Sequence, residues 1–164
     1  MANSVNGAAS DESPSIADVQ PMKEQAVDAV ILVGGRGTRL RPLTIGNPKP
    51  MLPTANHPFL QHLLARIKAA GITHVVMSTS FKAEIFEEYF GDGADMGLDI
   101  EYVVEDTALG TGGGIRNVYD HLRHDTVMVF NGDILSGMDL GGILDTHHSK
   151  DADLTMHQIG RAHV

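Results

Sequence analysis

The residues best suited to chemistry begin where an apolar run gives way to glycine. Residues 29–33 form a short apolar stretch of the kind that a buried parallel strand shows. Three of the next four residues, Gly34, Gly35 and Gly37, are glycines. Glycine removes side chains where a backbone must approach a ligand closely, so successive N–H groups can point at phosphate oxygens. The stretch therefore predicts a strand that runs into a phosphate-binding loop.

Basic residues gather around the same loop. The whole chain carries 12 Lys and Arg against 21 Asp and Glu, yet residues 29–83 contain no acidic residue. A local positive region in an acidic protein favours a small anionic ligand over nucleic acid, which needs a broad basic face. The basic residues of this region are Arg36, Arg39, Arg41, Lys49, Arg66, Lys68 and Lys82. We interpret the last three as solvated residues on helix surfaces.

Two further loops follow predicted strands. Residues 105–114 begin with Glu105, contain four glycines and form a predicted turn that leads into a helix. Residues 131–133, Asn-Gly-Asp, place Asp133 after another apolar run. The carboxyl ends of parallel strands meet at one edge of a sheet, where such folds bind ligands. Two backbone-donating loops, a group of cations and one carboxylate fit a nucleoside triphosphate with Mg²⁺.

Each of these features has a competing interpretation. A dinucleotide-binding fingerprint lacks its third glycine, because position 40 is Leu, and no acidic residue lies near twenty positions further on. A Walker P-loop needs Gly-Lys-Ser/Thr after the glycines, and that sequence is missing. Residues 112–114 are also compatible with a flexible turn, and Asp133 with a helix cap or an Asx turn. The histidines, His147 and His148 included, show no metal-binding spacing and are interpreted as surface residues.

Hydrophobic periodicity predicts alternating strands and helices. Strands are expected at residues 26–33, 72–79, 98–104, 126–130 and 152–158, and helices at 58–70, 82–90 and 139–149. Such alternation with short connections implies an α/β fold, with a mostly parallel sheet covered by helices on both faces.

Length and composition set the outer limits. The 164 residues are enough for one domain with a sizeable core, expected over residues 26–158. Residues 1–25 lack periodicity and are expected to be a disordered leader. The sequence shows neither a membrane-spanning segment nor a signal peptide, and it contains no cysteine. A cytoplasmic protein is therefore expected.

The motifs together resemble those of a known family. Residues 34–44 and 48–53 are similar to the signature of the sugar-1-phosphate nucleotidylyltransferases. Residues 109–114 and 130–133 resemble the next two motifs of that family, in the same order. The resemblance covers about residues 26–158 and is strongest to the mannose-1-phosphate guanylyltransferases of actinobacterial type. It implies a Rossmann-like nucleotidyltransferase domain.

The resemblance also implies a reaction. The phosphate of a hexose 1-phosphate, here mannose 1-phosphate, would attack the α-phosphorus of GTP with Mg²⁺ as cofactor, giving GDP-mannose and pyrophosphate. By analogy, Arg39 would hold the β- and γ-phosphates, Lys49 would neutralise charge at the α-phosphate, and Asp133 would bind Mg²⁺. Glu105 would accept hydrogen bonds from guanine N1–H and N2–H₂. The implied nucleotide-binding residues are Leu32, Val33, Gly34, Gly35, Arg36, Gly37, Thr38, Arg39, Lys49, Glu105, Gly110 and Thr111.

The resemblance has limits. The family's catalytic domain continues with sugar contacts and a second metal-binding Asp, and no segment here resembles that part. The chain is therefore expected to be an N-terminal fragment, truncated on its C-terminal side and without turnover of its own. Residues 159–164 are expected to be a non-native tail.

Three alternative functions stay open. Thymidylyl or uridylyl transfer to glucose 1-phosphate uses the same motifs. A non-catalytic regulatory paralogue that binds a nucleotide sugar need not keep Arg39, Lys49 and Asp133, and all three are present. A glycosyltransferase would favour Asp-x-Asp for its metal, where this chain has Asn-Gly-Asp. The expected partners are small molecules, without nucleic acid or membrane, and a homo-oligomer is compatible with the sequence.

Overall fold

The computed structural model describes residues 25–35, 37–80, 82–107 and 109–157. Of the predicted leader only Gln25 is described, and its backbone N–H donates to the carbonyl oxygen of Gly71 at 3.0 Å. Arg36 and the predicted tail at 159–164 lie outside the described residues. No helix within the described ranges is long and apolar enough to span a bilayer.

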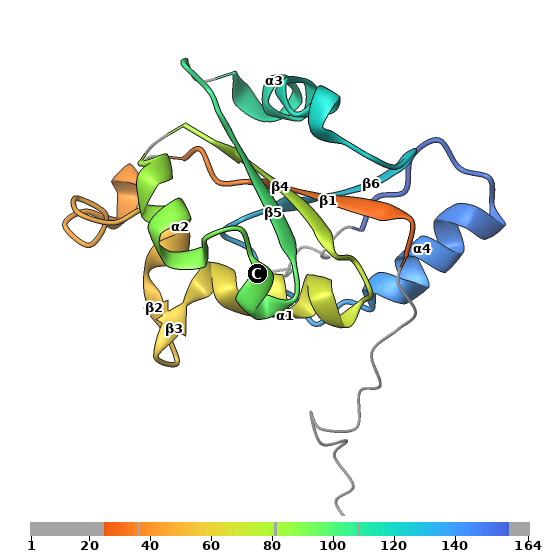
Figure 1. Cartoon of the computed structure of the whole chain (residues 1–164), viewed down its shortest axis with the longest axis horizontal. Helices are drawn as coiled ribbons and strands as arrows, with labels where there is room; N and C mark the ends of the chain where they lie inside the picture. The colour runs from red at the N-terminus through yellow and green to blue at the C-terminus, as the bar shows by residue number, and fades with distance from the viewer. Residues whose placement is uncertain (1–24, 36, 81, 108, 158–164) are drawn as a thin grey trace, which may run out of the picture.

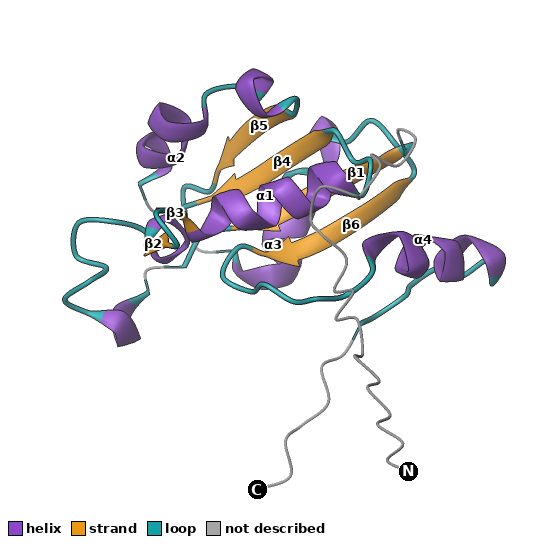
Figure 2. Ribbon diagram, turned by 90° about the horizontal axis from the view of Figure 1, so that it is seen from below, coloured by secondary structure: helices purple, strands orange, loops and turns teal. Residues whose placement is uncertain are grey.

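Four parallel strands form the centre of the fold (Figure 1). Their order across the sheet is β5-β4-β1-β6. They are β1 (Val27–Leu32), β4 (His74–Thr79), β5 (Asp99–Val104) and β6 (Thr126–Asn131). Because all four run the same way, their carboxyl ends lie at one end of the sheet, as the arrows in Figure 2 show.

Helices cover both faces of this sheet (Figures 1 and 2). One face carries α1 (Phe59–Ala69), α2 (Ala83–Phe90) and α4 (Leu140–Ser149), and the other carries α3 (Gly110–Asn117). The connections include the short helical turns η2 (Thr38–Leu40), η3 (Lys49–Met51), η4 (Ala94–Met96) and η5 (Tyr119–His121), and the small hairpin of β2 (Pro53–Thr54) and β3 (His57–Pro58). The α/β prediction is confirmed, and the seven predicted elements before residue 150 agree with the structure to within two residues.

The larger apolar core lies between the sheet and α1. Leu60, Leu63, Leu64 and Ile67 recur at helical spacing on α1 and are all buried. They belong to one cluster with Ile31 of β1, which is fully buried. Because side chains alternate along a strand, Val27, Ala29 and Ile31 of β1 lie on this face, and Val30 lies in the smaller core on the opposite face.

On the opposite face of the sheet, the structure of the α3 segment differs from the prediction. The smaller core on that face contains Val30, Val76 and Val118, the residue that directly follows α3. The glycines at 110–114, predicted as a turn before a helix, form the first part of α3 itself. Glycine is a poor helix former, so tertiary contacts and not local propensity decide the helical state of this segment.

The predicted strand at residues 152–158 is wrong. Residues 152–157 form no strand, and Leu154 and Met156 are 77% and 74% exposed. Their alternating pattern suits a half-buried strand, but a strand also needs a neighbour to pair with. Among the described strands, β6 pairs only with β1, and no strand lies on its other edge.

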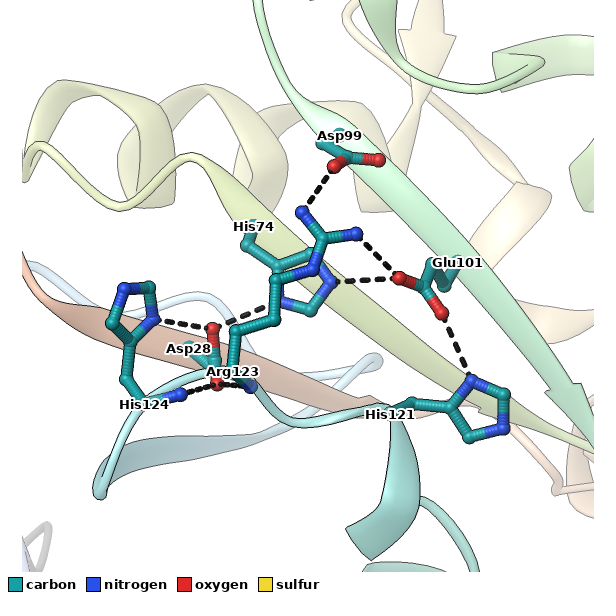
Figure 3. Close-up of polar contacts among 7 residues, drawn as sticks. All are labelled: Asp28, His74, Asp99, Glu101, His121, Arg123 and His124. Atoms are coloured by element: carbon teal, nitrogen blue, oxygen red, sulfur yellow. Dashed lines mark hydrogen bonds and ion pairs between the residues drawn. The ribbon is translucent and has the colours of Figure 1, made fainter.

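A polar cluster lies near the amino ends of the strands, on the α3 face of the sheet (Figure 3). Asp28 is fully buried, and its carboxylate accepts four hydrogen bonds: from the ring Nδ1 of His74 and of His124, and from the backbone N–H of Arg123 and of His124, at 2.6–2.8 Å. The cluster corrects the interpretation of the histidines as surface residues, since His74 is buried. We call it the amino-end cluster; its members are Asp28, His74, Asp99, Glu101, His121, Arg123 and His124.

Glu101 is the second hub of the amino-end cluster. Arg123 donates to Glu101 from Nη2 and to Asp99 from Nη1, both at 2.5 Å. Nδ1 of His121 lies 2.9 Å and Nε2 of His74 3.2 Å from Glu101 oxygens. Hydrogen bonds from His121 and Arg123 lower the pKa of Glu101 to about 2. Burial raises the pKa of Asp28, but its hydrogen bonds outweigh burial and lower it overall.

These two depressed pKa values predict acid-sensitive stability. A carboxyl group whose folded pKa is depressed contributes stability that is present above its ordinary pKa and is lost as the pH falls towards the folded value. The ordinary values are 4.5 for Glu101 and 3.8 for Asp28. We therefore expect the midpoint of urea unfolding to fall steadily below about pH 4.5.

Replacing Glu101 should flatten that acid dependence. The Glu101→Gln variant has one titrating group fewer, so its urea midpoint should change less than that of the parent chain between about pH 4.5 and pH 2. Glu88→Gln makes the same chemical change at an exposed position of α2 and should keep the parent profile. An unaltered profile in Glu101→Gln would contradict the prediction.

Candidate nucleotide site

A cavity of about 560 Å³ opens at the carboxyl ends of β1, β4 and β6. Its wall consists of Leu32, Val33, Gly34, Gly35, Gly37, Arg39, Leu40, Lys49, Pro50, Ser78, Ser80, Glu105, Gly110, Thr111, Asn131 and Asp133. The structure thus brings together every predicted site residue that it describes, except Thr38. Thr38 is exposed, and the residue before it, Gly37, has the left-handed conformation with φ of +57°.

The loop after β1 shows why glycines are needed. A Cβ atom built on Gly34 would lie 2.7 Å from Oγ of Ser80, and that hydroxyl donates to the carbonyl oxygen of Gly34 at 2.5 Å. Gly37 is enclosed by Thr44, whose hydroxyl donates to the carbonyl oxygen of Gly37 at 2.8 Å. A Cβ on Gly35 would meet nothing within 4 Å, and Gly35 lines the cavity. Its backbone is therefore open to a ligand.

Lys49 and Asp133 form the charged pair of the cavity. Nζ of Lys49, at the start of η3, lies 2.6 Å from Oδ2 of Asp133, which follows β6. Their side chains are 38% and 42% exposed, so both groups can be reached from the cavity. Without a ligand the ammonium and the carboxylate neutralise each other. A bound polyphosphate and a cation would offer each of them a new partner of opposite charge.

The cavity residues could hold a cation only together with the phosphate oxygens of a ligand. Among the described residues there is no group of three or more His, Cys, Asp or Glu side chains able to hold a metal. Asp133 supplies one carboxylate at the cavity wall, next to Asn131. Mg²⁺ in proteins is commonly held by one or two carboxylates, water and substrate phosphates. The residues therefore fit a Mg²⁺ ion that binds together with a triphosphate. They do not fit a site in which protein side chains supply all the metal ligands.

Glu105 connects the cavity to the first turn of α3. One of its oxygens accepts from the hydroxyl of Ser78 at 2.7 Å, and the other from the backbone N–H of Leu109 at 3.1 Å. Each carboxylate oxygen has a second lone pair, so Glu105 can hold these two partners and still accept from a ligand. A Cβ on Gly114 would lie 2.8 Å from a Glu105 carboxylate oxygen, so a larger residue at position 114 would displace the Glu105 side chain.

Sequence reasoning missed Leu40, Pro50, Ser78, Ser80 and Asn131 as cavity residues. A signal for the serines was present, because Ser78 and Ser80 stand at the carboxyl end of the second predicted strand. The rule that locates ligands at carboxyl strand ends applied there as well. Asn131 was part of a recognised motif but was given no role.

The three basic residues interpreted as solvated each also donate to a backbone carbonyl oxygen. Arg66 donates from Nη2 to the carbonyl oxygen of Met138 at 2.6 Å, and Lys68 donates to that of Gly97. Lys82 donates to the carbonyl oxygens of Ile45 and Gly46, at 3.3 and 2.6 Å. None of the three lines the cavity. Lys82 thus anchors the far end of the loop that carries Arg39 onto the start of α2.

The parallel sheet carries the glycine loop and the cation–carboxylate pair at its strand ends, an arrangement of the α/β class. The chain belongs to the nucleotidyl transferase family, whose model matches residues 28–163. The resemblance seen in the motifs is therefore confirmed.

Individual relatives agree with this family. The mannose-1-phosphate guanylyltransferase of Mycobacterium tuberculosis is 64% identical over 135 residues, which are 82% of this chain and 38% of that protein. The D-glycero-α-D-manno-heptose 1-phosphate guanylyltransferase of Aneurinibacillus thermoaerophilus is 41% identical over 79% of this chain and 56% of that protein. The chain thus spans between about two fifths and just over half the length of these relatives.

A solved structure shows the same fold. The crystal structure of HddC from Yersinia pseudotuberculosis, complexed with GMP-PN, superposes with a TM-score of 0.66 at 30% sequence identity. The superposition covers 73% of this chain and 53% of that one.

Proposed function

We propose that the protein represented by this chain transfers a guanylyl group from GTP to mannose 1-phosphate, giving GDP-mannose and pyrophosphate. The observation that carries the proposal is the cavity itself, where glycine backbone, Lys49 and Asp133 meet at the strand ends. The names of the 64% identical relative and of the guanine nucleotide bound by HddC support the base and the sugar.

The reaction balances without a covalent enzyme intermediate. A phosphate oxygen of mannose 1-phosphate forms a bond to the α-phosphorus of GTP, and the bond from that phosphorus to the oxygen bridging to the β-phosphate breaks. Pyrophosphate leaves with the electron pair. Such a transfer needs alignment and charge neutralisation from the protein more than it needs acid or base chemistry.

We assign roles to the residues of the cavity wall on this basis. The backbone N–H groups of Gly34 and Gly35 would hold phosphate oxygens, and Arg39 would neutralise the departing pyrophosphate. Lys49 would offset the charge that develops at the α-phosphate. Asp133 would hold Mg²⁺, which when bound draws charge from the phosphate oxygens. Glu105 would accept from the N–H groups of guanine.

Titration of the chain with nucleotides tests this proposal. We expect GTP with Mg²⁺ to bind more tightly than dTTP or UTP in isothermal titration calorimetry, because only guanine offers two adjacent N–H donors to a carboxylate. Tighter binding of dTTP or UTP would favour the thymidylyl or uridylyl alternative. Absence of any nucleotide binding would contradict the assignment of the cavity.

The Glu105→Gln variant should lose preference for guanine. Glutamine keeps the shape but exchanges one acceptor for a donor, which leaves a guanine N–H facing another donor. The affinity for GTP should fall by roughly 1 to 3 kcal/mol, about 5- to 150-fold, with a smaller change for dTTP and UTP. The measurement is the ratio of dissociation constants for the three triphosphates.

Ser78→Ala is the matched control for that variant. It removes the hydroxyl that donates to Glu105 but leaves the carboxylate in place. If Glu105 reads the base, Ser78→Ala should keep most of the preference for GTP, because the carboxylate that accepts from guanine is still present. Equal selectivity in the parent and in Glu105→Gln would move base recognition to another residue.

A further inference from the structure

We propose that the amino-end cluster is a positioning device for the nucleotide site. It fixes the loop after α3 to the sheet, and through that loop it keeps the glycine-rich helix α3 in place at the opposite end. The proposal rests on the proposed function only for the choice of GTP as ligand.

Helix α3 is weak by itself. Four of its eight residues are glycines, at positions 110, 112, 113 and 114. Glycine lowers helix stability more than any residue except proline, and an isolated helix of this length does not persist in water. The order of α3 must therefore come from contacts at its two ends and along its buried side. Its first two residues, Gly110 and Thr111, line the cavity, so this order matters to a ligand.

The start of α3 is held within the cavity. The backbone N–H of Leu109 donates to Glu105, and Gly114 lies close to the same carboxylate. These contacts depend on one side chain that also faces the ligand space.

The far end of α3 is held by the cluster. Val118 is fully buried and Leu122 packs against the same small core. Beyond Leu122, the backbone N–H groups of Arg123 and His124 both donate to the buried carboxylate of Asp28. The side chains of His121 and Arg123 reach across to Glu101 on β5 (Figure 3). Two strands of the sheet thus hold the four-residue segment 121–124.

The amino-end cluster lies away from the cavity. Neither Asp28 nor Glu101 lines the cavity. Between Thr111, which lines the cavity, and His121 of the cluster lie the last six residues of α3, about 9 Å at the usual helical rise, and residues 118–120. Asp28, Glu101 and Arg123 are therefore positioning residues, which act on the ligand through α3.

Hydrogen exchange of the ligand-free chain tests the proposal. We expect Glu101→Gln and Arg123→Gln to speed exchange of the α3 amides by about tenfold, because α3 then opens more often, while the amides of α1 keep their parent rates. Both residues are at least partly exposed, so these variants should fold. Glu88→Gln, at an exposed position of α2, is the matched control and should leave α3 unchanged.

Measurements with nucleotide distinguish the positioning role from a merely structural one. The affinity for GTP with Mg²⁺ should fall in step with the exposure of α3, because the ligand must first restore the ordered helix, and saturating GTP should return α3 exchange to the parent rate. Unchanged α3 exchange in both variants, or equal acceleration of α1 and α3, would overturn the positioning role. If the parent chain bound no GTP, the proposed function would fail, and the exchange rates of the ligand-free variants would still decide the role of the cluster.

Discussion

Replacing Lys49 with alanine is expected to lower kcat by about 100-fold or more, the usual scale for removing one preorganised group that stabilises transition-state charge. Nζ of Lys49 lies beside Asp133 at the wall of the cavity. Its positive charge would stabilise the transition state more than the bound substrates, because negative charge then shifts onto the transferring phosphate. The rate is best measured as pyrophosphate release by a chimeric enzyme. In it, the segment of the M. tuberculosis relative that this chain matches is replaced by this chain's residues, so that a complete family member carries the site.

Whether Lys49→Ala changes kcat or KM decides which role the lysine has. Lys150→Ala removes a lysine from an exposed position after α4 and should leave both constants near the parent values. A Lys49→Ala variant that changed KM alone would show that the lysine binds substrate and transition state equally. Arg39→Ala should instead weaken triphosphate binding as well as turnover, because its proposed phosphates are present in the ground state.

The candidate site residues were predicted from the order of strands and loops along the chain, and the structure places most of them around one cavity. Gly34, Lys49 and Asp133 each stand directly at or after a predicted strand or loop, and the common edge of a parallel sheet brings such positions together. Thr38 is the exception, since it is exposed and is not among the residues of the cavity wall. The residue before it, Gly37, has a left-handed backbone conformation, which the local pattern does not show.

Two features of the fold could not be predicted from local pattern. The glycines of α3 have turn-like propensity, so their helical state depends on tertiary contacts, among which are the close approach of Gly114 to Glu105 and the burial of Val118. The amino-end cluster depends on strand register, since Asp28 and His74 meet only because β1 pairs with β4. Residues 46 positions apart carry no mutual signal in one sequence.

Asp28→Ala is expected to cause the largest loss of stability of any single substitution in this cluster. The carboxylate of Asp28 is fully buried and accepts from two ring nitrogens and two backbone N–H groups. Alanine would leave these donors buried or half-buried without an acceptor, a change that typically costs about 3 to 5 kcal/mol. A domain of this size has about 5 to 15 kcal/mol in total, so the folded chain would become marginal. Urea unfolding at neutral pH measures the loss as a lower midpoint with an unchanged slope.

Two further variants serve as comparisons. Asp28→Asn removes the charge of Asp28 but keeps its shape, and Asp125→Ala removes a nearby carboxylate that lies outside the cluster. Asparagine keeps one acceptor oxygen but places an NH₂ group against N–H donors, so it should recover only part of the loss. Asp125 lies at an exposed position just past the segment that Asp28 holds, and its replacement should cost less than about 0.5 kcal/mol. If Asp28→Ala also unfolded at nearly the parent urea concentration, water must replace the carboxylate at no cost. The loop at 121–124 would then be held to the sheet by Glu101 and the apolar contacts of Leu122, without any contribution from Asp28.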